Sequence, residues 1–181
     1  MKTYISILRG INVSGQKLIK MDALREMFSG LGLHNVQTYI QSGNVLFKSK
    51  QTDEEKLARK IEKEISKKFG LEVPVMVKEI NELKEIIHKN PFLKDASKDI
   101  SLIHVTFLSA IPAGENFDKI KSIQSQQDEF QLGGKSIYLY CPNGYGNTKL
   151  NNNFFESKLK ATATTRNWRT LNELIKMAEK L

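Results

Sequence analysis

The sequence of 181 residues carries 28 Lys and Arg residues against 20 Asp and Glu residues, which gives a net charge of +8. Hydrophobic residues make up 40% and charged residues 27% of the chain, a balance that excludes a disordered, collagen-like or coiled-coil protein. The single cysteine excludes an internal disulfide, and no segment reaches the ~18 apolar residues that a membrane span needs. The apolar run at residues 4–8 is also too short for a signal peptide, so we expect a cytoplasmic protein.

The first half of the chain alternates between strand and helix patterns. The signals are β-branched runs, apolar residues at helical spacing, and turns that contain glycine. In chain order they predict a strand at 3–8, a helix at about 21–31, and strands at 36–40 and 45–48. A helix that begins after Thr52 or Asp53 and a strand at 73–77 follow. This β-α-β-β-α-β order is that of a ferredoxin-like unit.

The second half repeats the same order of elements. The patterns predict a strand at 102–108, a helix at 117–123, hairpin strands at 129–132 and 136–141, a helix at 150–159, a short strand at 161–165 and a terminal helix at 168–181. A connecting helix at 79–89 and a polar stretch at 90–99 separate the two halves. We therefore predict an α+β protein of two ferredoxin-like halves with antiparallel sheets and a C-terminal helix, divided into domains at 1–90 and 91–181.

Two loops of the first half gather polar side chains and glycines. The loop at residues 9–15 follows the first strand, and the turn at residues 41–44 joins two strands. Glycine lets a backbone approach a ligand closely. The candidate ligand-binding residues in these loops are Arg9, Asn12, Gln41 and Asn44. The alternative is structural: a tight crossover in the first loop and a hairpin turn in the second.

Two loops of the second half carry the remaining candidates. A glycine-rich loop at residues 142–150 precedes a helix, and free N–H groups at a helix start favour an anion. It is not a Walker A loop. The segment at 164–170 holds arginine, whose planar fork suits phosphate. The candidate ligand-binding residues are Thr148, Lys149, Arg166 and Asn167. The alternative is that Asn167 caps the last helix while Trp168 packs against the core.

The sequence contains no constellation that points to catalysis or to metal binding. His34, His88 and His104 stand apart from other metal-binding residue types, so we expect no metal and no cofactor. A Gly-x-Ser-x-Gly motif is absent, and Cys141 reads as a buried strand residue. The sequence therefore identifies no catalytic residue and leaves open whether the protein is an enzyme.

Four segments stand out when they are taken together: LRGINVSG, TYIQSGNVLF, GNTKLNNNFFESKL and ATTRNWRTL. In this order they resemble the bacterial family catalogued as domain of unknown function 1697. The resemblance covers residues 3–181 and implies a two-lobed α+β fold with ferredoxin-like halves. It implies no activity and no catalytic residues.

Two hypotheses for the function follow. The first is a binding module for a small anionic, phosphate-bearing ligand, which the net charge and the loops at 142–150 and 164–170 favour. The second is an enzyme of unknown substrate whose pocket is formed by the loops at 9–15 and 41–44. Nucleic acid is a less favoured partner, because the tyrosine-bearing strands do not match the RNA-binding signature. A pure interaction protein is a further alternative. We expect no membrane partner, and the sequence leaves the oligomeric state open.

Overall fold

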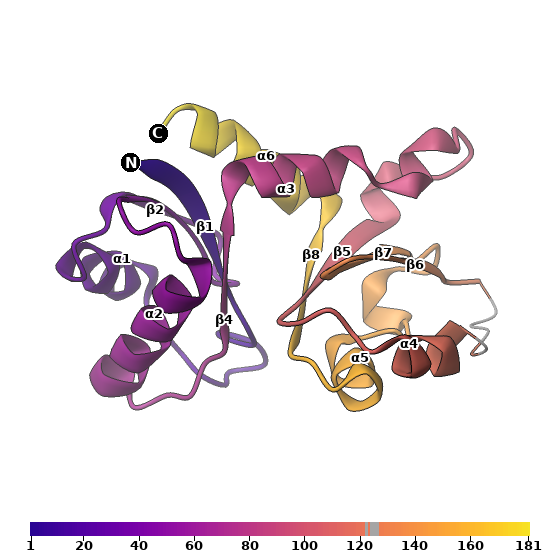
Figure 1. Cartoon of the computed structure of the whole chain (residues 1–181), viewed down its shortest axis with the longest axis horizontal. Helices are drawn as coiled ribbons and strands as arrows, with labels where there is room; N and C mark the ends of the chain where they lie inside the picture. The colour runs from indigo at the N-terminus through magenta and orange to yellow at the C-terminus, as the bar shows by residue number, and fades with distance from the viewer. Residues whose placement is uncertain (122, 124–126) are drawn as a thin grey trace. The chain divides into compact units, whose positions relative to one another are not determined.

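The computed structural model describes residues 1–121, 123 and 127–181. The first half contains β1 (Lys2–Leu8), α1 (Met21–Gly30), β2 (His34–Tyr39), β3 (Asn44–Ser49), α2 (Glu54–Phe69) and β4 (Val75–Glu79), followed by α3 (Ile80–His88) (Figure 1). Its strands form one four-stranded sheet in the order β2-β3-β1-β4, and every neighbouring pair is antiparallel.

The second half forms a sheet of the same kind. It contains η1 (Pro91–Lys94), η2 (Ile100–Leu102), β5 (Ile103–Leu108), α4 (Gly114–Lys121), β6 (Glu129–Gly133), β7 (Ser136–Tyr140), η3 (Tyr145–Asn147), α5 (Asn152–Leu159), β8 (Ala163–Asn167) and α6 (Trp168–Glu179). The strand order is β6-β7-β5-β8, again antiparallel throughout. The prediction of an α+β protein with antiparallel sheets is therefore confirmed. Residue 122, within the predicted helix at 117–123, lies outside the described residues.

Contacts between residues group the chain into two compact units. The first unit comprises Met1–Lys84 together with Glu173–Leu181, and the second comprises Glu85–Asn172. The last residues of α6 thus belong to the first unit. Whether residues 1–90 and 91–181 fold as separate domains stays a prediction. Within the described residues, no helix is long and apolar enough to cross a membrane.

The core of the first unit lies between its sheet and two helices, α1 and α2, which cover one face (Figure 1). The apolar residues of α2 recur at helical spacing, so Leu57, Ile61 and Ile65 all point into this core. The Phe47 ring of β3 stacks on Tyr4 at 5.8 Å and meets the edge of Phe28 at 5.7 Å between ring centroids. These contacts fix the rotation of both helices against the sheet.

The start and end of α2 follow the predicted signals. Asp53 is the N-cap, because its carboxylate accepts the backbone N–H of Lys56 at 3.0 Å. This hydrogen bond is the main cause that lowers the pKa of the Asp53 carboxyl. Gly70 ends the helix in the left-handed conformation, with a φ of +66°.

The core of the second unit is rich in phenylalanine. The Phe130 ring meets the edges of Phe117 and Phe155, each at 6.2 Å between centroids, and so joins α4 and α5 to the sheet. The predicted helix start at Leu150 is wrong, since α5 begins at Asn152. Its N-cap is Asn151, whose side chain accepts the N–H of Phe154 at 3.0 Å.

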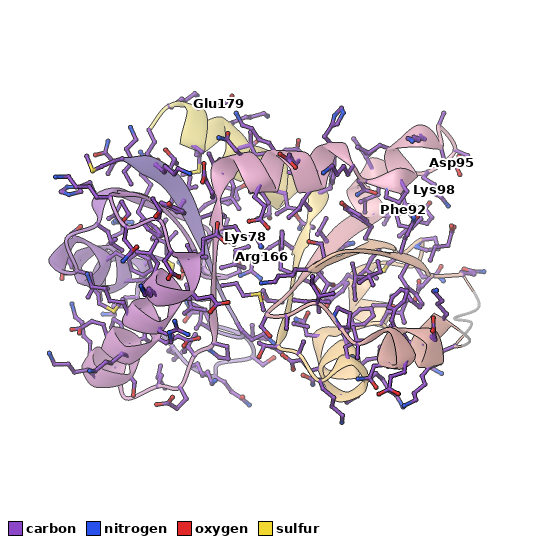
Figure 2. All side chains as sticks on the ribbon, in the orientation of Figure 1. Lys78, Phe92, Asp95, Lys98, Arg166 and Glu179 are labelled. Carbon is purple, nitrogen blue, oxygen red and sulfur yellow. The ribbon has the colours of Figure 1, made fainter. Side chains whose placement is uncertain are left out.

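Contacts of Lys98 stabilise the segment that precedes β5, which contains η1 and η2. The Lys98 ammonium lies 4.3 Å from the ring centroid of Tyr140 and 5.5 Å from that of Phe92, and it pairs with Asp95 at 3.8 Å and with Glu129. Figure 2 shows Phe92, Asp95 and Lys98 gathered in this segment. Cation–π and ionic contacts therefore order a stretch with little regular structure.

His104 gives the second unit a pH-dependent stability. Its ring is 8% exposed, stacks on Tyr145 at 4.9 Å, and lies with Nδ1 3.1 Å from the Leu102 carbonyl oxygen. Burial lowers the pKa of His104. The folded protein therefore holds this proton less tightly than the unfolded chain, whose imidazole titrates near ~6.5. Unfolding takes up a proton below that pH, so the free energy of unfolding falls as the solution is acidified.

We predict that His104→Gln reduces the loss of stability between pH 7.5 and pH 5. The substitution removes the proton uptake that accompanies unfolding, although it also costs packing at both pH values. Urea denaturation at the two pH values measures the difference. His88→Gln, at an exposed position, is the control and should keep the loss of the parent protein. An equal loss in the parent and in His104→Gln would contradict the prediction.

Candidate functional site

The two predicted loops of the first unit lie side by side. The Asn12 side chain joins them, because Nδ2 donates to the carbonyl oxygens of Ile19 at 3.0 Å and Gln41 at 2.9 Å. Its Oδ1 accepts the N–H of Ile19 at 2.8 Å. Two of the four predicted loops are thus brought together, but the Asn12 amide is engaged by the protein's own backbone.

The Asn44 side chain makes hydrogen bonds within the turn between β2 and β3. It is fully buried, and its Nδ2 donates to the Tyr39 carbonyl oxygen at 3.2 Å and to Ser42 Oγ at 2.9 Å. These contacts favour the hairpin-turn alternative for Asn44. Gln41 is exposed, whereas Arg9 is partly buried. The backbone N–H of Arg9 donates to the Pro74 carbonyl oxygen at 2.9 Å.

The helix-start loop of the second unit contacts the carboxylate of Asp128, which lies just before β6. Thr148 Oγ1 donates to Asp128 Oδ2 at 2.5 Å and accepts the N–H of Leu150 at 3.0 Å. A negative charge beside the Thr148 hydroxyl opposes the approach of an anion. Lys149 is exposed. These contacts do not favour an anion site at Thr148.

Arg166 and Asn167 lie at the end of β8. Arg166 is 8% exposed, and its Nη1 donates at 2.9 Å both to Thr164 Oγ1 and to the Thr165 carbonyl oxygen (Figure 2). Asn167 Oδ1 accepts the N–H of Thr170 at 2.8 Å, which is the capping contact of the structural alternative. Trp168 is intermediate in exposure. A single site shared by all four loops stays a prediction.

A cleft of about 350 Å³ opens on the first unit. Three segments line it: the connection from α1 to β2, the end of β3, and the first two turns of α2. The lining residues are Leu31, Gly32, Leu33, His34, Ser49, Lys50, Gln51, Lys56, Leu57 and Lys60. Figure 1 shows α1 and α2 on the same face of the first sheet, where these segments meet.

Local structure positions the lysines of this cleft. Lys56 and Lys60 are four residues apart on α2, so they share a face of the helix. The Lys60 ammonium donates to the Leu31 carbonyl oxygen at 2.7 Å, at the end of α1, where the helix dipole is negative. The Lys56 ammonium lies 3.5 Å from an Asp53 carboxylate oxygen. Lys50 is exposed and follows β3 directly.

The polar side chains at the end of β3 are fixed as well. Ser49 is 5% exposed, and its Oγ accepts the N–H of Gln51 at 3.0 Å. Gln51 Oε1 accepts the N–H of Asp53 at 3.1 Å. The Ser49 hydroxyl proton and the Gln51 amide N–H groups can therefore be offered to a ligand.

The charge of the cleft is positive. Among the described residues that line it, three are lysines and none is Asp or Glu. In the sequence these lysines resemble ordinary surface charges, because Lys50 follows a strand while Lys56 and Lys60 lie on the next helix. The spacing of Lys56 and Lys60 was the one available signal. Over the described residues, no group of three or more His, Cys, Asp or Glu residues could hold a metal ion.

Comparison with known proteins identifies the family. The model of the family described as "Protein of unknown function (DUF1697)" matches residues 1–138. The chain belongs to this family. The matched residues include the loops of the first unit and the whole cleft, and they end before the loops at 142–150 and 164–170.

A solved structure shares the fold. It is that of the conserved bacterial protein SP0830 from Streptococcus pneumoniae, with a TM-score of 0.78 and 20% sequence identity. The match covers 98% of each chain. No curated protein matches the chain.

Gly43 is predicted to be the most constrained glycine of the two neighbouring loops. Its φ is +77°, and a Cβ at this position would lie 2.7 Å from Leu8 Cβ and 2.8 Å from Ile11 Cδ1. Gly43→Ala should therefore lower the free energy of unfolding by roughly 2–4 kcal/mol, from backbone strain and overpacking together. Urea denaturation measures this loss.

Gly15→Ala is the matched control. Gly15 has a similar φ of +74°, but no atom lies within 4 Å of a Cβ built there. This variant should show only the conformational cost of about 1–2 kcal/mol. Equal losses for the two variants would show that Leu8 and Ile11 do not constrain the turn.

Proposed function

We propose that the protein is a binding module for a small anionic ligand that bears a phosphate group. The observation that carries the proposal is the cleft of the first unit, where the lining residues that the structure describes include three lysines and no carboxylate. A cleft lined by charges of one sign raises the local concentration of the opposite ion.

The arrangement of Lys56 and Lys60 supports this proposal. Like charges four residues apart on a helix repel each other, and a bound anion between them would relieve that repulsion. Lys60 is already held by the Leu31 carbonyl oxygen, so less side-chain entropy is lost when a ligand binds. Ser49 and Gln51 add neutral hydrogen-bond donors beside the charges.

We further propose that each unit is ferredoxin-like and that the protein is a bacterial, cytoplasmic one. The order β-α-β-β-α-β in each half supports the first point. In each sheet the third strand lies between the first and the second, as expected for a split β-α-β unit. The bacterial source of the similar solved structure supports a bacterial origin, and the single cysteine fits a reducing compartment.

We predict that Lys56→Met/Lys60→Met weakens the binding of inorganic phosphate and of phosphate monoesters by about tenfold or more. A hydrogen bond to a charged group contributes ~1.5–3 kcal/mol, and ~1.4 kcal/mol corresponds to a factor of ten in affinity. Isothermal titration calorimetry of the parent and the variant measures the change. Binding to the parent should also weaken as salt is added, because part of the attraction is screened.

The matched control is Lys63→Met/Lys67→Met. These lysines are also four residues apart on α2 and exposed, but they lie outside the cleft. The control removes the same total charge and should change affinity by less than about twofold. If both double variants weaken binding equally, the attraction comes from the overall charge and the cleft is not the site.

A further inference from the structure

We infer that the ligand of the cleft is a phosphorylated polyol, such as a sugar phosphate, rather than a nucleotide. This inference rests on the proposed function, since it concerns the part of the ligand beyond its phosphate group. Three properties of the cleft lead to it: its charge, its lining and its size.

The charge of the cleft fits one phosphate group. Lys50, Lys56 and Lys60 contribute three positive charges, and Asp53, which pairs with Lys56, contributes one negative charge. Two positive charges remain. A phosphate monoester carries about −1.5 to −2 charges at pH 7 and so balances them. A ligand with two or three phosphate groups would bring more negative charge than these residues neutralise.

The lining offers hydrogen bonds rather than a platform for a base. Proteins usually recognise nucleobases by stacking them on aromatic rings or on arginine. The described lining residues include no Phe, Tyr, Trp or Arg, and the one aromatic ring among them is that of His34. Ser49 and Gln51 provide the donors instead, held in place by the contacts to Gln51 N and Asp53 N. Such donors can form hydrogen bonds with the hydroxyl groups of a ligand.

The size of the cleft also favours a short ligand. Its volume of about 350 Å³ lies near the lower end of the ~300–1,000 Å³ that is typical of small-molecule sites. Leu33 and Leu57 are 5% and 2% exposed, so the apolar part of the wall belongs to the core and cannot readily yield space to a fused ring. The phosphate and a short hydroxylated carbon chain therefore fill the site.

The test compares ribose 5-phosphate with adenosine 5′-monophosphate, which share the sugar phosphate and differ in the base. Calorimetry on the parent protein should give ribose 5-phosphate an affinity at least equal to that of the nucleotide. Ser49→Ala and Gln51→Ala should each weaken ribose 5-phosphate by about threefold or more and leave inorganic phosphate within about twofold, since a neutral hydrogen bond contributes a few-fold in affinity. Gln51 is exposed, so its variant keeps the test open if the Ser49 variant fails to fold.

Two results would overturn the inference while the proposed function stands. One is a nucleotide that binds tenfold or more tightly than ribose 5-phosphate and is weakened by Lys56→Met/Lys60→Met. The other is a nucleotide affinity that falls in His34→Ala while that of ribose 5-phosphate does not, because the base would then stack on His34. If no phosphate compound binds the parent protein, the proposed function fails and the inference fails with it.

Discussion

The rotational position of α2 is the constraint on which the cleft depends. The Asp53 cap fixes where the helix begins, and Leu57, Ile61 and Ile65 lock one face of it against the sheet. Once those residues are buried, Lys56 and Lys60 must stand on the face toward the end of α1 and the end of β3. Because the helix fixes the angle between these lysines and the buried residues, the ammonium groups could leave the cleft only if the apolar face of α2 left the core.

The cleft lies between this fixed helix, the end of α1 and the turn after β3. The Leu31 carbonyl oxygen at the end of α1 holds Lys60, and the turn after β3 presents Ser49 and Gln51. Each polar group is therefore held by backbone contacts before any ligand arrives, which lowers the entropic cost of binding. The loops at 9–15 and 41–44 differ because each asparagine amide already donates to two acceptors: Asn12 to the Ile19 and Gln41 carbonyl oxygens, and Asn44 to the Tyr39 carbonyl oxygen and Ser42 Oγ. Their arrangement is suited to holding a hairpin.

The sequence predicts elements well where local signals act alone. Asp53 and Gly70 mark the ends of α2 as expected, and Asn167 caps the last helix. The start of α5 was misplaced because Asn151 competes as a cap and Thr148 takes the Leu150 N–H. The strand predicted at 161–165 lies at Ala163–Asn167, since its limits follow the pairing with β5. The cleft could not be predicted because it forms where the end of β3 and the connection after α1 meet α2, and the spacing of Lys56 and Lys60 alone does not reveal that meeting.

The location of the bound phosphate tests the central claim most directly. A titration of the isotopically labelled protein with ribose 5-phosphate, followed by nuclear magnetic resonance, reports which backbone and lysine side-chain signals move. Anion binding at the cleft predicts saturable shifts at Ser49, Lys50 and Gln51 and at the ammonium groups of Lys56 and Lys60, with Lys63 and Lys67 unchanged. Saturable shifts confined to the loops at 142–150 and 164–170, with a silent α2, would contradict the account and return the site to the residues around Arg166.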